Sequence, residues 1–265
     1  MAHPRSRKTA AAAFAIALGA AALVAGGPPA QAIHDGNRST TEDHPWVAAI
    51  EDEEGFQFCG GTVLRGRFVL TAAHCVVNRS SGSLRVVVGR TDLRTDAGTV
   101  VRVDDIWVHP DYQEVAAGVD LALLTLRSEV TTGSLRLAVP RDQMGQLGQL
   151  RKVYGWGRTE NHATGSPVLR TTRLVLAELQ GCFPYTEPEE SPRERLCGLP
   201  PDDGEGSICP GDSGGPLASR DRLVGVVSSG NKFCDSQFPV SVFTRVSTAT
   251  ESLRAQMNAS DAPLR

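Results

Sequence analysis

The eleven-residue stretch GSICPGDSGGP, Gly206–Pro216, is the most informative part of the chain. Ser213 lies between glycines, which allow a tight backbone turn and the close approach of another molecule. A serine hydroxyl becomes a useful nucleophile only when a base removes its proton, and the oxyanion that then develops needs backbone N–H donors. Because a glycine-rich turn with an incidental serine has the same pattern, other residues must supply the chemistry.

A candidate base and a candidate orienting acid lie upstream of Ser213. His74 lies in Leu70–Cys75 (LTAAHC), shortly after Cys59–Thr62 (CGGT), and Asp120 opens Asp120–Leu124 (DLALL). Alone, a histidine after a strand is more often structural, and an aspartate before a strand is common. Taken together with GDSGGP, these motifs resemble the chymotrypsin/trypsin family of serine proteases. Their order His74, Asp120, Ser213 is also the order of that family and differs from other Ser-His-Asp hydrolases.

Four further segments extend the resemblance over about residues 33–257. They are Val108–Tyr112 (VHPDY), Tyr154–Gly157 (YGWG), Leu223–Gly230 (LVGVVSSG) and Val242–Val246 (VFTRV). The resemblance implies an all-β fold of two six-stranded antiparallel β-barrels with a C-terminal helix, and an active site in the cleft between the barrels. It also implies three disulfides, Cys59–Cys75, Cys182–Cys197 and Cys209–Cys234, whereas spacing alone leaves fifteen pairings open.

The resemblance also assigns roles to individual residues. Ser213 is the expected nucleophile and His74 its general base, and the N–H groups of Gly211 and Ser213 are the expected oxyanion hole. Ser228 matches the serine that hydrogen-bonds Asp120. The chemistry requires no metal and no organic cofactor. Calcium is not expected, because the loop 90–98 holds Asp92 and Asp96 but lacks the family's pair of spaced glutamates.

Residues 1–32 have the pattern of a secretory signal peptide. Arg5, Arg7 and Lys8 precede a short apolar run, and Ala30-Gln31-Ala32 forms a small-x-small cleavage pattern. We therefore expect a secreted, extracellular protein with a protease domain over 33–257 and a tail over 258–265. The signal contains three basic and no acidic residues, so its removal leaves 24 basic and 30 acidic residues, a formal net charge of −6. That balance argues against nucleic-acid partners.

The mature part shows many short β-type runs separated by Gly, Pro, Asp and Asn, which is typical of a β-sandwich or barrel. The expected strands include 46–50, 62–70, 84–88, 100–108, 121–126, 151–156, 223–228 and 240–246. One helix is expected, over about 248–257, since this stretch lacks Gly and Pro. The charged stretch 187–194 is expected to be a surface loop.

The start of the mature chain departs from the family pattern. Family members mature to Ile-Val-Gly-Gly, whose new α-amine pairs with the aspartate before the catalytic serine, here Asp212. This chain has Ile33-His-Asp-Gly36 directly after the predicted cleavage site. We therefore expect signal peptidase to create the activating Ile33 terminus without a separate propeptide. The alternative is that Ile33 is only the first ordered strand residue.

The residues matched to the substrate pocket carry no charge. Ser207 occupies the position where trypsin-type enzymes have aspartate, and Ile208, Ser228, Gly230 and Ser241 complete the expected pocket. An uncharged pocket disfavours a buried cation, so cleavage is expected after apolar residues such as Leu, Met or Phe. An insertion or deletion in the segment 234–242 would instead place Asp235 in the pocket.

Two other functions remain open from the sequence. One is a homologue that keeps the fold but only binds partners, although such proteins usually lose a residue of the triad, and this chain keeps all three. The other is an esterase with little peptidase activity, because Ser229 replaces the family's tryptophan beside the pocket. Expected partners are protein or peptide substrates and protein protease inhibitors, with no nucleic acid and no membrane. The mature protein is expected to be a monomer.

Overall fold

The computed structural model describes residues 1, 33–34, 36–115, 117–161, 164–186, 193–204, 206–234 and 236–261. The expected signal peptide, apart from Met1, lies outside the described residues. So do Asp235 and most of the expected surface loop 187–194.

The first barrel is a closed ring of six antiparallel strands. In ring order they are β2 (Val47–Glu51), β3 (Gln57–Arg65), β4 (Phe68–Thr71), β9 (Ala122–Leu126), β6 (Thr99–Val108) and β5 (Arg85–Val88). The stretch 62–70, expected as one strand, is wrong as a single element, because the chain reverses within it. Gly66 has φ +48°, a conformation that glycine adopts without strain, and it forms the turn between β3 and β4.

The second barrel is a second ring of six antiparallel strands. In ring order they are β11 (Leu150–Gly155), β12 (Arg170–Ala177), β13 (Arg195–Leu199), β16 (Ser241–Arg245), β15 (Arg222–Gly230) and β14 (Pro216–Ser219). Two short strands join this sheet from outside the ring: β1 (Asn37–Arg38) pairs with β12, and β10 (Arg136–Leu137) pairs in parallel with β15. These two barrels confirm the expected fold class.

In the part of the chain that the structure describes, a small hairpin and four 3-10 turns lie outside the barrels. The hairpin pairs β7 (Tyr112–Glu114) with β8 (Ala117–Gly118). The turns are η1 (Ala73–Cys75), η2 (Ser81–Ser83), η3 (Pro140–Asp142) and η4 (Leu179–Cys182).

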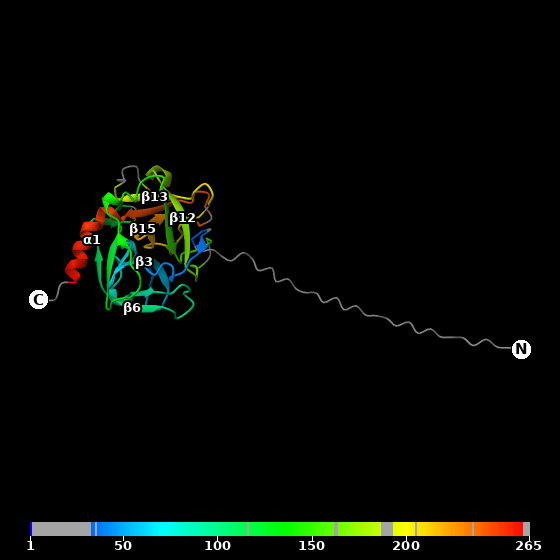
Figure 1. The fold of residues 1–265 in the computed structure, drawn as a ribbon, viewed down its shortest axis with the longest axis horizontal. Coiled ribbons are helices and arrows are strands. Elements are labelled where there is room, and N and C mark those ends of the chain that lie inside the picture. Colours follow the sequence, from blue (N-terminus) through cyan, green and yellow to red (C-terminus); the bar gives the residue numbers. More distant parts are fainter. Residues whose placement is uncertain are drawn as a thin grey trace.

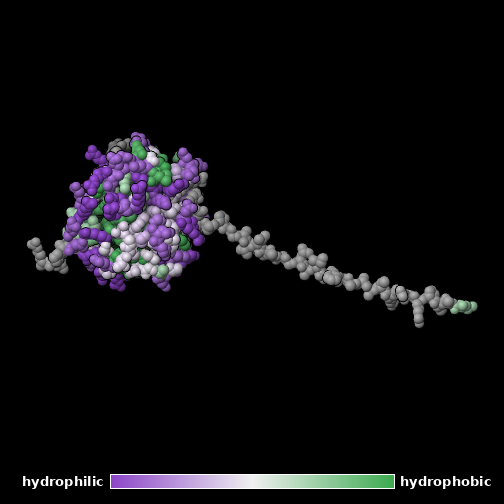
Figure 2. All heavy atoms as spheres, viewed as in Figure 1, coloured by the Kyte–Doolittle hydropathy of each residue, from purple (hydrophilic) through white to green (hydrophobic). Residues whose placement is uncertain are grey.

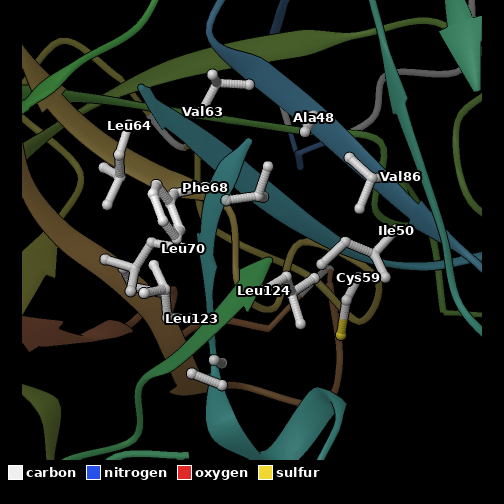
Figure 3. Packing of buried hydrophobic residues seen from close by; sticks show 14 of the residues in the cluster. Ala48, Ile50, Cys59, Val63, Leu64, Phe68, Leu70, Val86, Leu123 and Leu124 are labelled. Atoms are coloured by element: carbon white, nitrogen blue, oxygen red, sulfur yellow. The ribbon is translucent and has the colours of Figure 1, made fainter. Parts of the chain in front are cut away.

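Several strands of the first barrel are buried on both faces, which explains why their sequences are continuously apolar. All five residues of β9 are buried, although neighbouring side chains on a strand point in opposite directions. Figure 3 shows Leu124 directed toward Ile50 and Val86, while the adjacent Leu123 lies beside Leu70. One face of β9 therefore fills the barrel, and the other packs against further buried side chains of the same core cluster.

The helix α1 (Val246–Ser260) closes the described chain and lies along one side of the molecule, next to the strands (Figure 1). Val246, Ala249, Leu253 and Met257 lie on its buried face and join an apolar core cluster that contains residues of both barrels. The helix is longer than the expected stretch 248–257, because the apolar spacing of three and four residues starts at Val246. It therefore includes the first residues of the expected tail.

Three disulfides join Cys59–Cys75, Cys182–Cys197 and Cys209–Cys234, as the resemblance implied. Hydrophilic residues cover most of the face seen in Figure 2, apart from scattered apolar patches. Among the described residues, no helix has the length and apolar character needed to span a membrane.

Candidate active site

The expected acid and base are in direct contact in the first barrel. His74 lies in η1, immediately after β4, and Asp120 lies two residues before β9. Since β4 and β9 are hydrogen-bonded neighbours, they hold these two segments together. His74 Nδ1 donates to Asp120 Oδ2 at 2.8 Å, and the His74 backbone N–H donates to Asp120 Oδ1 at 2.9 Å. An aspartate placed in this way orients the imidazole and stabilises its charged form.

The second barrel also holds Asp120, which is completely buried. Ser228 Oγ, in β15, donates to Asp120 Oδ2 at 2.6 Å, and Thr244 Oγ1, in β16, lies 3.4 Å from the Asp120 carbonyl oxygen. A buried carboxylate is costly unless donors satisfy it, and here those donors come from both barrels. The Asp120–His74 pair therefore lies where the two barrels meet.

Ser213 lies on the loop before β14, and this loop is fastened to both barrels. The Gly60 N–H of β3 donates to the Ser213 carbonyl at 2.7 Å, and the Gly214 N–H donates to the Val227 carbonyl of β15 at 2.8 Å. A Cβ on Gly214 would lie 3.2 Å from the nitrogen of Ala72, so this glycine permits close contact with the segment that carries His74. Within the described residues, no hydrogen bond joins the Ser213 hydroxyl to the His74 ring. Such catalytic contacts are often long without substrate.

The two N–H groups expected to bind an oxyanion are available. Neither the Gly211 nor the Ser213 N–H donates to any residue that the structure describes. Gly211 has φ +101°, which only glycine adopts readily, and its carbonyl accepts a 2.9 Å hydrogen bond from Gln57 Nε2. The sequence analysis missed Gln57, because nothing in the local pattern distinguishes it from any polar residue at the start of a strand.

Asp212, the expected partner of a new N-terminus, is completely buried. Its carboxylate accepts backbone N–H groups from Gly157 at 2.8 Å and Cys209 at 2.9 Å. Burial raises the pKa of Asp212 to about 7, although these two N–H groups act in the opposite direction. The ion pairs found among the described residues do not include Asp212. Ile33 is also completely buried, in the same apolar cluster as Ile208.

The segment that begins at Ile33 lies against the expected base of the substrate pocket. The Ser207 N–H donates to the His34 carbonyl at 3.2 Å, and the two residues form an isolated antiparallel bridge. Ser207 is only 1% exposed. The backbone next to Ile33 is therefore paired with the residue expected at the base of the pocket.

Three other residues of the expected pocket are brought together by the folding of distant segments. The Ile208 N–H donates to Ser241 Oγ at 3.2 Å. A Cβ on Gly230 would lie 3.0 Å from Ile208 Cδ1, so the isoleucine side chain lies directly against this glycine. Ser228, two residues before Gly230 on β15, directs its hydroxyl to Asp120 instead. Asp235, the alternative pocket residue, lies outside the described residues.

Two groups that resemble metal ligands have other partners. Cys59, His74 and Cys75 place ligand-type atoms close together, but both sulfurs belong to one disulfide and are not thiolates. In the loop 90–98, hydrogen bonds from the Arg94 side chain and backbone lower the pKa of Asp92 to about 2. Arg94 Nη2 lies 2.6 Å from Asp92 Oδ2.

Arg195 is a second residue that the sequence analysis missed. It lies in β13, is 1% exposed, and donates from Nη1 to Ser228 Oγ at 2.8 Å. The only signal in the sequence is an arginine two residues before Cys197 in an apolar run. A charged residue in a predicted strand is unusual, but the sequence does not identify its hydrogen-bond partner, Ser228, which lies 33 positions away.

Two six-stranded barrels that meet at an imidazole–carboxylate pair, beside a glycine-flanked serine, define a serine peptidase of the two-barrel class. Comparison with known proteins agrees, because the family model described as Trypsin matches residues 33–253. The chain belongs to the trypsin family and is a serine endopeptidase, which acts on proteins or peptides. Its disulfide-rich structure is consistent with an extracellular protein.

Individual relatives cover most of the chain. It is 34% identical over 224 residues to "Trypsin" of Saccharopolyspora erythraea, an alignment that covers 84% of this chain and 97% of that protein. It is 30% identical over 213 residues to "Trypsin 5G1" of Aedes aegypti, with 79% of each chain covered.

Proposed function

We propose that Ser213 is the nucleophile, His74 the general base and Asp120 the orienting acid of this endopeptidase. The observation that carries the proposal is the His74–Asp120–Ser228 network, closed by hydrogen bonds of 2.8 and 2.6 Å and placed beside the Ser213 loop. In this scheme Ser213 Oγ attacks the peptide carbonyl carbon and His74 Nε2 takes the serine proton. The amine leaves with that proton, and water then hydrolyses the acyl-enzyme by the same route.

The N–H groups of Gly211 and Ser213 would stabilise the tetrahedral oxyanion. Support comes from their lack of any other acceptor among the described residues and from the left-handed backbone of Gly211. Preorganised donors of this kind act most strongly where charge develops in the transition state.

We propose that the enzyme cleaves after uncharged, mostly apolar residues of moderate size. Ser207 at the base and Ser241 on the far wall of the pocket offer only hydroxyls, and Ile208 forms an apolar wall against Gly230. A buried Arg or Lys side chain of a substrate would lack a carboxylate partner there, which costs several kcal/mol in effective terms.

We propose that cleavage before Ile33, by signal peptidase during export, activates the enzyme. The buried Ile33, the bridge from His34 to Ser207 and the buried carboxylate of Asp212 support this proposal. An α-ammonium at Ile33 would supply the cation that the carboxylate lacks among the described residues. The proposed product is a secreted, extracellular monomer that begins at Ile33, with its protease domain over 33–257 and a tail over 258–265, with protein protease inhibitors as additional partners and no affinity for nucleic acid or membranes.

The test is hydrolysis of peptide p-nitroanilides bearing Arg, Phe, Leu or Ala before the scissile bond, with a simple ester in parallel. Wild type is expected to cleave Phe or Leu, and Ser213→Ala is expected to lose at least about 10³-fold in kcat. Preference for Arg would leave the triad intact but refute the pocket assignment. Cleavage of the ester alone would favour the esterase, and no reaction from protein that begins at Ile33 would favour a binding homologue.

A further inference from the structure

A groove lies between the helix α1 and the segment 134–141, on the side of the molecule where Figure 1 shows the helix. Its volume is about 580 Å³. The Thr250 hydroxyl of the helix donates to the Ala138 carbonyl at 2.7 Å, which holds the two walls of the groove together. None of the residues that line the groove belongs to the proposed triad, the proposed oxyanion hole or the expected substrate pocket. The groove is therefore a separate feature of the surface.

The lining of the groove combines an apolar floor with basic sides. Four apolar side chains at the groove are at most 6% exposed and form its floor: Leu64, Leu135, Leu137 and Met257. Five arginines and no carboxylate complete the charged part of the lining: Arg65, Arg136, Arg141, Arg222 and Arg254. Figure 2 shows hydrophobic residues framed by hydrophilic ones on this side of the molecule.

Three of the five arginines have acidic partners beside the groove. Arg65 pairs with Asp261, Arg136 with Asp221, and Arg222 with Asp142. These pairs hold the guanidinium groups in place and neutralise much of their charge.

Arg141 and Arg254 differ from the other three. Both are exposed, and neither makes an ion pair or a side-chain hydrogen bond with any residue in the described part of the chain. Glu251 lines an adjoining hollow together with these two arginines, but it forms an ion pair with neither. Its exposed charge is screened by water. The groove therefore offers two guanidinium groups whose donors are free for a partner.

This basic groove belongs to a protein whose overall charge is negative. Removal of the predicted signal leaves 24 basic and 30 acidic residues. The field of the whole protein therefore does not attract anions, whereas the groove attracts them locally. Arginine keeps its charge at every working pH, so the neighbouring guanidinium groups repel each other until an anion lies between them. This arrangement favours a negatively charged partner at this one place.

We propose that the groove binds a segment of a partner protein that carries both carboxylates and apolar side chains. The carboxylates pair with Arg141 and Arg254, whose planar forks match a carboxylate in geometry. The apolar side chains lie on the floor that the leucines and Met257 form. This floor favours a polypeptide over a sulfated polysaccharide, which supplies negative charge but few apolar groups. The inference does not depend on the proposed triad.

The test measures binding of a fluorescently labelled peptide in which Glu and Leu alternate, by anisotropy. The protein is the processed Ser213→Ala variant, because it is not expected to cleave the peptide. Arg141→Gln with Arg254→Gln is expected to raise Kd about tenfold, which corresponds to the loss of two exposed ion pairs. Binding should also weaken steeply as the ionic strength rises to about 1 M, where charges are screened within about 3 Å. No measurable binding at low ionic strength would overturn the proposal.

A matched control separates the groove from the effect of net charge. Arg102 and Arg127 are also exposed, they are neighbours through a 2.9 Å backbone hydrogen bond, and neither lines the groove. Arg102→Gln with Arg127→Gln removes the same charge and should leave Kd close to that of the parent protein. If both double variants lose affinity equally, the attraction is not specific to the groove and the proposal fails.

Two further probes test the chemistry of the partner. A peptide in which Glu and Ser alternate has the same charge without apolar side chains, and it should bind at least about tenfold more weakly. Equal affinity for both peptides would overturn the role of the apolar floor. Heparin, a sulfated polysaccharide, is tested in parallel, and binding of heparin without binding of the Glu–Leu peptide would refute a polypeptide partner.

Activity on a short substrate shows whether the groove variant is intact. With Ser213 present, Arg141→Gln with Arg254→Gln should keep the wild-type kcat/KM on a peptide p-nitroanilide, because the groove lies outside the proposed active site. An inactive wild-type enzyme that still binds the peptide through the groove would refute the proposed function and leave this inference standing. A large loss of kcat/KM in the groove variant alone would show that the groove is not separate from the active site and would overturn the inference.

Discussion

The side-chain amide of Gln57, in the first barrel, donates a 2.9 Å hydrogen bond to the carbonyl of Gly211, on the loop that carries Ser213. This bond crosses from one barrel to the other and restrains the peptide next to one of the two proposed oxyanion donors. The relative position of the two barrels therefore affects the conformation of the loop that carries Ser213.

Removing this bond is expected to slow the chemical step. Gln57→Ala should lower kcat about tenfold with little change in KM, because the Gly211 N–H would no longer be held toward the developing oxyanion. Gln57→Glu, which is similar in shape but cannot donate from its carboxylate, should lose at least as much. Steady-state kinetics on one peptide substrate measures both variants, and an unchanged kcat in both would exclude a positioning role for Gln57.

Activity is expected to depend on a free amine at Ile33. A precursor that retains residues before Ile33 should have little activity, and Asp212→Asn should reduce kcat/KM of the processed enzyme on the order of 100-fold. The amide can fill the space of Asp212 but cannot pair with an ammonium. N-terminal sequencing must accompany the assay. A fully active enzyme that starts before Ile33, or a fully active Asp212→Asn, would refute the activation pair.

The stability of precursor and processed enzyme should diverge as the pH rises. Without the amine, burial raises the pKa of Asp212 from 3.8 to about 7. The folded precursor then holds a proton that the unfolded chain has lost, so its stability is greatest below about pH 4 and falls as the pH rises through 7. An ammonium at Ile33 offsets this loss. The difference between the melting temperatures of the processed enzyme and the precursor should be larger at pH 7 than at pH 4. An equal difference at both pH values would contradict the pairing.

A charge at the base of the pocket is expected to change the substrate preference. Ser207→Asp places a carboxylate where a substrate cation would lie, and it should raise the ratio of kcat/KM for Arg over Leu substrates by about 10- to 100-fold. Ser207→Asn, similar in shape but uncharged, is the control and should leave the ratio close to that of wild type. A ratio that stays low in Ser207→Asp would mean that Ser207 does not face the substrate.

The disulfide beside His74 is expected to support both stability and activity. Replacing Cys59 and Cys75 with alanine opens a loop of 16 residues, which should cost about 3 kcal/mol of stability. Because Cys75 belongs to η1 with His74, kcat of the folded protein should also fall. The pair Cys182–Cys197 closes a loop of similar length, 15 residues, in the second barrel. Its removal should cost similar stability, as measured by denaturant unfolding, with a smaller effect on kcat.

Sequence reasoning predicted some elements better than others for physical reasons. The apolar run 121–126 stands out as a strand because β9 is buried on both faces. The run 62–70 is not a single strand, although its residues other than Gly66 suit one, because the left-handed backbone of Gly66 divides it. Helix α1 begins earlier than expected because Val246 packs in the apolar core, and the residues it contacts there lie outside any local window of sequence.

The amino-acid sequence by itself determined the class of protein and the order of the triad motifs, because these are properties of short stretches with unusual composition, and the disulfide pairs followed from the family resemblance that these stretches carry. Only the tertiary structure decided which distant side chains meet. The contacts of Gln57 with Gly211 and of Arg195 with Ser228 join residues 154 and 33 positions apart. Hydrogen bonds depend on distances of about 3 Å and on direction, and chain folding sets both without leaving a trace in the local pattern of residues.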